Sequence, residues 1–290
     1  MICAGSTADP DILSTILGMA LRLLALEALC EPDLEQKLKL VAALSEQAPH
    51  LAIDTDRQID PPGSLPGRPA RPELIEPSRV PHRSVQTEEG RAALIHAICH
   101  IEFNAINLAL DAVWRFPLMP EAFYRDWMRV ATEEAYHFSL LHQHLRTQFN
   151  SRYGEFPAHD GLWSMCEKTR DDITARMALV PRTLEARGLD ATPLIQKKLR
   201  AAGKPDALAA CDILDIILRD EIGHVAIGNH WYRWLCERQG LDPVAYYEVL
   251  SHRYKAPRLR GPFNTAARQR AGFSEQELSK LENSAEKGSA

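Results

Sequence analysis

Apolar residues recur at spacings of three and four over most of the chain, and this period predicts an all-α protein. Between residues 87 and 240 the pattern predicts four long helices. The first should end at about Phe116, because Pro117 follows it, and Pro120 can occupy the first turn of the second. The fourth is expected to span about residues 205–238. Four helices of this length predict a four-helix bundle.

The third of these helices contains a proline. We expect it to run through Ile173 to about Arg187 and to end at Gly188, since glycine favours the left-handed conformation that ends many helices. Pro181 should bend it, because proline lacks an amide hydrogen and its ring crowds the preceding turn. The helical phase beyond Pro181 therefore depends on the size of that bend.

Further segments flank the predicted bundle. Two amphipathic helices over about residues 11–47 should be broken near Pro32. Ser274 and Glu277 have the spacing of a capping box and predict a short last helix. The sequence thus predicts four segments: an N-terminal helical segment (1–48), a linker or surface strap rich in proline and glycine (49–86), the bundle (87–240) and a C-terminal helical extension (241–290).

Two of the predicted helices carry the same short pattern, Glu134-x-x-His137 in the second and Glu221-x-x-His224 in the fourth. A spacing of three places both side chains on one face of a helix, where they can bind one metal ion together. A chain of this composition should contain about one Glu-x-x-His by chance, so the argument depends on placement. Both pairs lie within apolar stripes, where an unpartnered carboxylate is costly. A pair at the edge of its stripe that reaches solvent is the alternative.

Two further carboxylates complete a candidate metal site. Glu102 in the first helix precedes Glu134 by 32 residues, a separation that an antiparallel hairpin can bring to one level. Glu185 in the third helix precedes Glu221 by 36 residues and follows the same logic. Glu167, Asp171 and Asp172 compete with Glu185 for this place. The expected ligands of this di-iron or di-manganese carboxylate site are Glu102, Glu134, His137, Glu185, Glu221 and His224.

Neighbouring side chains can orient the two histidines. A metal-bound histidine commonly donates its second N–H to a carboxylate. We therefore expect Asp220 to support His137, and Glu133 to support His224, across the bundle. For both acids, a solvated position on the helix surface is the alternative. His100 is expected to support the site from outside the ligands or to lie at the surface.

Composition limits the possible partners. The 290 residues are 45% hydrophobic and carry a net charge of −5, which disfavours broad binding of nucleic acid or anionic membranes. The six cysteines have no Cys-x-x-Cys spacing and predict reduced packing residues of a cytoplasmic protein. No signal peptide or membrane span is expected. Six basic residues could contact phosphates or form a solvated surface: Arg253, Lys255, Arg258, Arg260, Arg268 and Arg270.

Residues 94–110, 124–138, 178–190 and 218–228 resemble segments of a bacterial family of uncharacterised ferritin-like proteins. The similarity extends from about Ala20 to Phe273. It implies a ferritin-like di-metal fold with the six ligands named above, but it does not supply a reaction. The family has an acid where this chain has Asn107, five residues from Glu102 and on a different face of the helix.

Six nitrogen and oxygen ligands without a thiolate suit iron or manganese better than zinc or copper. We expect two such ions, with iron favoured, in an oxidoreductase that activates O₂ to hydroxylate or oxidise an unidentified substrate. An electron-donor protein is an expected partner. The alternatives are a ferroxidase or iron-storage protein and a metal-free helical scaffold. The ligand spacing also resembles a tRNA-hydroxylating di-iron bundle, so tRNA stays among the substrates to test.

Overall fold

The structure is a computed structural model that describes residues 20–286, with side chains up to Asn283. Within these residues the regular elements are helices, and β-type pairing is limited to an isolated bridge between Leu74 and Ala158. The all-α prediction is confirmed. Cys3 and the predicted helical residues before residue 20 lie outside the described part. The chain divides into two compact units, Met1–Pro69 with Asn107–Thr132, and Ala70–Ile106 with Glu133–Ala290.

The first unit contains the N-terminal helices α2 (Leu21–Cys30) and α3 (Leu34–Gln47). The predicted break between them is confirmed. Asp33 begins α3 as its N-cap, because its carboxylate accepts the backbone N–H of Gln36 at 2.8 Å. The segment rich in proline and glycine that follows contains only short 3₁₀ turns among its described residues, Ala48–His50 and Pro77–Arg79, as the prolines predict.

Two long helices, α4 (Glu88–Arg115) and α5 (Glu121–Phe149), pass from one unit into the other. The break between them at Pro117 and Pro120 is confirmed. By length and composition α4 could cross a membrane, but 78% of its most apolar window is buried inside the protein. Burial of this kind is typical of a core helix of a globular protein.

The predicted third helix differs from expectation. Its residues form α7 (Ile173–Leu179), a π-helical segment η3 (Val180–Glu185) and α8 (Ala186–Ala202). The expected end at Gly188 is wrong, because helix continues to Gly203, which adopts the left-handed conformation at φ +64°. The disturbance expected at Pro181 takes the form of the π-helical segment, in which each turn accommodates an additional residue.

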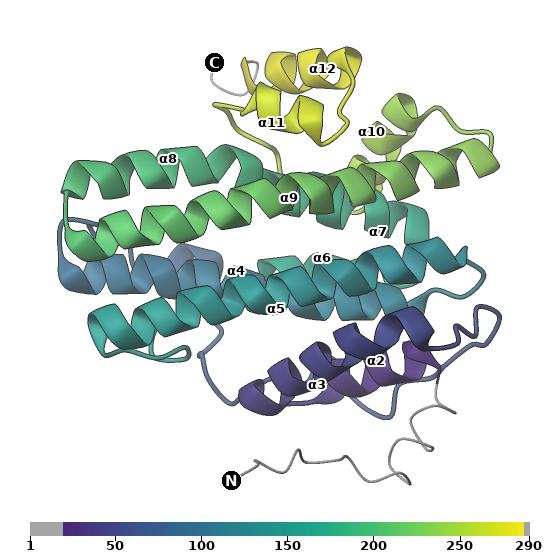
Figure 1. Cartoon of the computed structure of the whole chain (residues 1–290). Helices are drawn as coiled ribbons and strands as arrows, with labels where there is room; N and C mark the ends of the chain where they lie inside the picture. Colours follow the sequence, from purple (N-terminus) through teal and green to yellow (C-terminus); the bar gives the residue numbers. More distant parts are fainter. Residues whose placement is uncertain (1–19, 287–290) are drawn as a thin grey trace, which may run out of the picture. The chain divides into compact units, whose positions relative to one another are not determined.

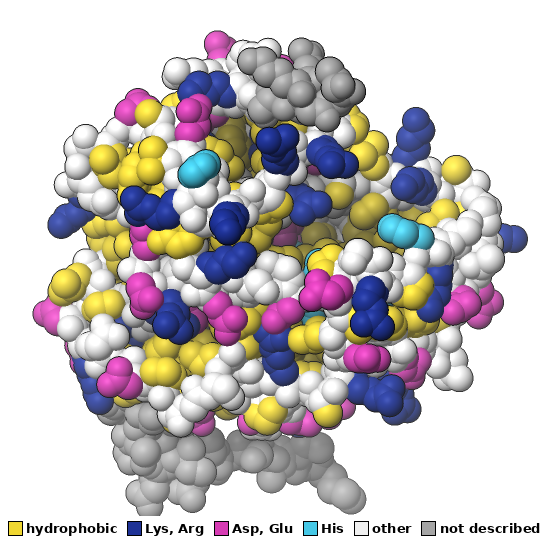
Figure 2. Space-filling model, turned by 180° about the vertical axis from the view of Figure 1, so that it is seen from behind, with side chains coloured by type: hydrophobic (Ala, Val, Ile, Leu, Met, Phe, Trp, Pro, Cys, Tyr) yellow, Lys and Arg dark blue, Asp and Glu magenta, His cyan; other side chains and the backbone are white. Residues whose placement is uncertain are grey.

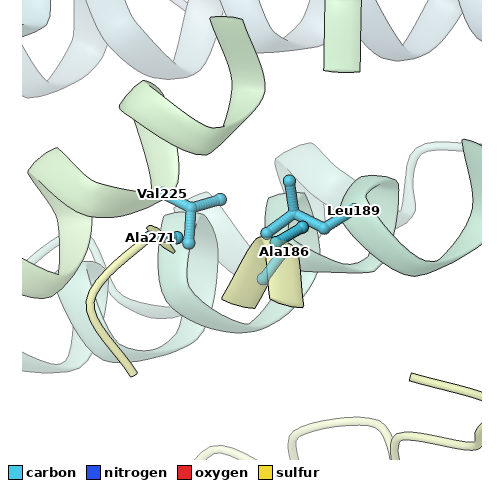
Figure 3. Packing of buried hydrophobic residues seen from close by; sticks show 5 residues of the cluster. Ala186, Leu189, Val225 and Ala271 are labelled. Atoms are coloured by element: carbon cyan, nitrogen blue, oxygen red, sulfur yellow. The ribbon is translucent and has the colours of Figure 1, made fainter. Parts of the chain in front are cut away.

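The α8 helix and α9 (Pro205–Arg238) form an antiparallel pair joined at Gly203 (Figure 1). The short helix α6 (Gly161–Lys168) precedes α7. In the second unit, α8, α9 and the α11 region enclose a small apolar core of Ala186, Leu189, Val225, Ala267 and Ala271, and Figure 3 labels all of these except Ala267. This arrangement of α4, α5, α7–α8 and α9 fits a four-helix bundle.

Three helices form the C-terminal segment: α10 (Pro243–Arg253), α11 (Thr265–Arg270) and α12 (Glu275–Glu286). The predicted capping box at the start of α12 is present. Glu277 accepts the N–H of Ser274 at 2.7 Å, and the Ser274 hydroxyl accepts the N–H of Glu277 at 3.3 Å. On the face shown in Figure 2, basic and acidic side chains are intermingled.

Candidate metal centre

The second unit brings all six candidate ligands into its interior. Glu134 and His137 on α5 are fully buried, and the other four are at most 8% exposed. Glu102 lies on α4, Glu185 ends η3, and Glu221 and His224 lie on α9. The possible ligand atoms of Glu102, Glu134, His137 and Glu221 all lie within 4.8 Å of one another, so this cluster could hold a metal ion.

Both histidines direct Nδ1 toward the carboxylates. His137 Nδ1 lies 3.4 Å from Glu134 Oε2 and 3.5 Å from Glu102 Oε2. His224 Nδ1 lies 2.9 Å from Glu134 Oε1 and 3.7 Å from Glu221 Oε1. Glu134 therefore lies between the two imidazoles, whose ring centres are 5.8 Å apart. Glu185 is not among the four residues whose ligand atoms lie within 4.8 Å of one another, but its carboxyl is buried and its Oε2 has no hydrogen bond to the described residues.

The opposite ring nitrogens contact the two acids that precede the Glu-x-x-His pairs. His137 Nε2 lies 3.1 Å from Asp220 Oδ2, and His224 Nε2 lies 2.6 Å from Glu133 Oε2. Both contacts cross between α5 and α9, in the pairing expected from the sequence. A proton held on Nε2 by these acids would let Nδ1 bind a metal ion once the ion displaces the proton on Nδ1. That both acids tune a metal ligand stays a prediction.

Five buried polar atoms of the cluster form no hydrogen bond of acceptable geometry with the described residues: Glu102 Oε2, Glu134 Oε1, Glu185 Oε2, Glu221 Oε2 and His224 Nδ1. Two of them, Glu134 Oε1 and His224 Nδ1, nevertheless lie 2.9 Å apart. Buried polar atoms are normally hydrogen-bonded, and each such exception requires a physical explanation. A metal ion would provide it, since it binds carboxylate oxygens and imidazole nitrogen as ligands. The unpartnered atoms are therefore the property of this cluster that fits a metal site best.

Burial and like charge shape the acid–base properties of the cluster. Burial, followed by the charges of Glu221 and Glu134, raises the pKa of Glu185 well above its ordinary value. Burial and Glu134 raise the pKa of Glu102 well above its ordinary value and also raise that of Glu221. Because burial alone would raise its pKa, Glu134 owes its lowered value to the two histidines.

The histidines respond to the same negative field. Burial disfavours the imidazolium of His137, but hydrogen bonding to Glu102 and Glu134 outweighs it and raises its pKa to about 11. Burial likewise opposes charge on His224, and Glu134 and Glu133 raise its pKa well above the ordinary value. The cluster thus attracts positive charge. Two divalent cations would balance four ionised glutamates and take the place of the protons that the cluster otherwise retains.

Other residues singled out in the sequence have different surroundings. His100 contacts the Tyr153 hydroxyl at 2.9 Å and the backbone carbonyl of His159 at 3.2 Å. Its expected role beside the ligands stays a prediction. Asn107 is buried in the first unit, where its Oδ1 accepts a hydrogen bond from Lys37 Nζ at 2.9 Å. Asn107, which replaces the acid of the family pattern, therefore binds Lys37 and is not one of the clustered candidate ligands.

The competing acids of the predicted third helix are occupied or exposed. Asp172 caps α7 by accepting the N–H of Ala175 at 2.9 Å. Asp171 pairs with Arg170 on the surface, and Glu167 is exposed.

Within the basic stretch near the C-terminus, Arg268 is fully buried rather than solvated. A pocket of about 290 Å³ lies between α9 and the α11 region, and the cluster residues do not contribute to its lining.

A family profile described as "Protein of unknown function (DUF455)" matches residues 30–279. The chain belongs to this family. A Haemophilus influenzae (strain ATCC 51907 / DSM 11121 / KW20 / Rd) relative named "Uncharacterized protein" is 49% identical over 255 residues, which cover 84% of this chain and 87% of that protein. No solved structure matches the chain. Membership confirms the uncharacterised family suggested by the sequence; the family match does not establish the ferritin-like part of that resemblance.

Proposed function

We propose that the second unit holds a dinuclear iron or manganese centre and acts as an O₂-dependent oxidoreductase, with iron the favoured metal. The observation that carries this proposal is the buried cluster in which possible ligand atoms of Glu102, Glu134, His137 and Glu221 lie within 4.8 Å of one another, with His224 Nδ1 2.9 Å from Glu134 and a buried Glu185 oxygen that has no hydrogen bond to the described residues. One Glu from each of two helical stretches and one Glu-x-x-His pair from each of the other two is the ligand set of di-iron and di-manganese carboxylate bundles.

The protein residues have separate tasks in this proposal. Glu102, Glu134, Glu185 and Glu221 supply oxygen ligands, and His137 and His224 supply nitrogen ligands through Nδ1. When bound, an iron pair supplies the redox chemistry with dioxygen that amino-acid side chains cannot perform. Burial of the six side chains excludes water, so the carboxylates would interact with bound cations instead of with solvent. Because all ligands are nitrogen or oxygen, iron or manganese suits the site better than copper or zinc.

Asp220 and Glu133 link this interior to solvent. Their side chains are 19% and 38% exposed, while each contacts a buried imidazole. Each acid can hold the Nε2 proton of its histidine and exchange protons with water at the protein surface. Asp220 also accepts a hydrogen bond from the exposed Arg219 at 2.8 Å. We propose that protons consumed during turnover enter along these two contacts.

The proposed substrate is an organic molecule, and the proposed partner is an electron-donor protein. Iron storage is the competing function in the same chemical class. A storage protein must take up many ions per chain, whereas an oxidoreductase should saturate at about two. Ferrous iron titrated aerobically into metal-free protein, with particle size measured alongside, separates the two. Uptake that continues to hundreds of ions per assembly would replace the enzyme with a store.

Metal analysis tests the location of the centre. The purified protein should contain about two iron or manganese ions per chain. Replacing Glu134 and His137 together with alanine should remove most of this metal. The matched control is the double replacement of His230 and Glu237, an exposed pair on α9, which should leave the metal content unchanged. A full complement of metal in the Glu134/His137 variant would place the centre elsewhere.

A further inference from the structure

Arg182 lies inside the π-helical segment η3, three residues before Glu185, and is 4% exposed. Its Nη1 donates to Asn229 Oδ1 on α9 at 2.6 Å, and its Nη2 donates to Glu277 Oε1 on α12 at 2.6 Å. Three aromatic rings surround its guanidinium, those of Tyr232, Tyr247 and Phe273, with centres 4.7 to 5.3 Å away. Arg182 thus ties η3 to the C-terminal segment and to α9.

Both carboxylate oxygens of Glu277 are hydrogen-bonded, and Oε1 accepts from Arg182. Its second oxygen, Oε2, accepts the N–H of Ser274 at 2.7 Å and a hydrogen bond from Arg233 Nη2 at 3.0 Å. Burial opposes ionisation of Glu277, but the charge of Arg182 and the Ser274 N–H outweigh it and lower its pKa. The carboxylate therefore caps α12 and pairs with the buried arginine at the same time.

The backbone of η3 depends on tertiary contacts of this kind. A π-helix is rare and frequently occurs at functional sites. The Thr183 hydroxyl donates to the carbonyl of Ala178 at 2.8 Å, which provides a partner for a backbone group near the widened turn. Gly228 lets α9 approach closely, because a Cβ at this position would lie 2.5 Å from the Pro181 Cβ. Gly228 is one turn beyond His224, so this contact sets the distance between η3 and the ligands of α9.

We propose that the C-terminal helix α12 supports the metal centre from outside the ligands: through the Arg182–Glu277 pair it fixes η3 and so positions Glu185. Arg182 and Glu277 are positioning residues, since they act through Glu185. The inference rests on the proposed function for the metal and on the contacts of η3 for the mechanism. The C-terminal segment then has a defined task, which is to hold a backbone conformation that is unfavourable by itself.

The chain offers a matched control. Arg268 and Asp190 form a second buried arginine–carboxylate pair, with Nη2 and Oδ2 2.6 Å apart, that also attaches the C-terminal segment to α8. Glu277→Gln preserves the capping box, in which glutamine is equally favoured, but removes the charge that Arg182 pairs with. Asp190→Asn removes the corresponding charge of the other pair. Arg182→Gln serves as a second variant that removes the same pair from its other side.

The first measurement needs no metal. Deuterium exchange of metal-free full-length protein should show the amides of residues 180 and 182–185 exchanging at least about tenfold faster in Glu277→Gln and Arg182→Gln than in the wild type. Asp190→Asn should leave exchange of these amides unchanged while it loosens the α11 contact. Unchanged exchange in Glu277→Gln, or an equal increase in Asp190→Asn, would overturn the inference whatever the metal results are.

The second measurement uses Mn²⁺ alone, with free ion followed by electron paramagnetic resonance. We expect Glu277→Gln to bind Mn²⁺ about tenfold more weakly than wild type or Asp190→Asn, in the range seen when a residue that orients a ligand is lost. Faster exchange in η3 with unchanged Mn²⁺ affinity would overturn the claim that η3 positions Glu185. If the wild type binds no Mn²⁺ or iron, the proposed function fails, and deuterium exchange alone decides whether α12 holds η3.

Discussion

Each unit of this protein buries charge, and the two do so in opposite ways. In the first unit, Lys37 is fully buried, and its ammonium donates to the carbonyls of Ala28 and Leu29 and to Asn107 Oδ1, each at 2.9 Å. In the second unit, each of the four glutamates of the buried Glu/His cluster has an oxygen that forms no hydrogen bond of acceptable geometry with the described residues. Lys37, on α3, caps the C-terminal carbonyls of α2 and also binds Asn107 on α4. The buried carboxylates, in contrast, repel one another.

The difference separates structural from functional burial. A buried charged side chain whose hydrogen bonds are satisfied within the protein requires no ligand, and removing it lowers stability because its partners lose their hydrogen bonds. A buried cluster of like charges with unpartnered atoms lowers stability unless a ligand compensates it. Stability measurements on variants of the two units should therefore give opposite signs.

The largest expected stability effect is at the satisfied site. Lys37→Met preserves volume but removes a donor from three acceptors, of which Leu29 O still accepts the N–H of Gly67, so the free energy of unfolding should fall by about 2 kcal/mol. Metal content should not change. Burial lowers the pKa of Lys37 from 10.5 to about 7, so wild-type stability should rise with pH across that interval, because only the unfolded chain then retains the proton.

Chemical denaturation at several pH values measures both effects. Lys39→Met, an exposed position on the same helix, is the control and should change stability little. If Lys37→Met were as stable as the wild type, or if it retained the rise between pH 7 and 10.5, the hydrogen bonds of Lys37 would not be what stabilises this region.

A smaller effect is expected where the cluster meets solvent. Asp220→Asn should keep the fold but weaken metal binding by about ten- to a hundredfold, because the amide no longer fixes the Nε2 proton of His137 as a carboxylate does. Glu133→Gln should act in the same direction through His224, by a smaller factor, since its side chain is more exposed. Asp215→Asn, an exposed acid on the same helix, is the matched control. Equal Mn²⁺ affinity in all three variants would make Asp220 a bystander.

Helical periodicity explains how much of the cluster could be predicted. The two Glu-x-x-His pairs could be found from their spacing alone. The 32 residues between Glu102 and Glu134 predict an antiparallel hairpin, and in the structure Glu102 Oε2 lies 3.5 Å from His137 Nδ1. Asp220 and Glu133 follow from the same geometry, since an acid one residue before each pair faces the neighbouring helix. These are short-range regularities of α-helices, which the sequence records directly.

The contacts that hold η3 have no such signal. Arg182 and Glu277 are 95 residues apart, and no period of the sequence relates them. Pro181 indicates a disturbance in the third helix but not whether it becomes a kink or a π-helical segment. Gly188 resembles a helix end, yet the left-handed turn occurs at Gly203, because tertiary packing of α8 on α9 overrides the weak preference of one glycine. Residue spacing therefore predicts the candidate ligands better than it predicts the contacts that support them.

The smallest expected effect tests the unsatisfied cluster directly. Glu185→Gln removes a carboxyl whose pKa is raised well above the ordinary value by burial and by Glu221 and Glu134. A raised pKa means that the contribution of Glu185 to stability is present in acid and is lost as pH rises above the unfolded value of 4.5. The metal-free variant should therefore be about 1 kcal/mol more stable than wild type at pH 7 and equal to it near pH 4. Calorimetry with Glu167→Gln, an exposed acid on α6, as the control measures this difference. A loss of stability at pH 7 would mean that Glu185 is satisfied within the protein, as Lys37 is, and the contrast between the two regions would fail at this residue.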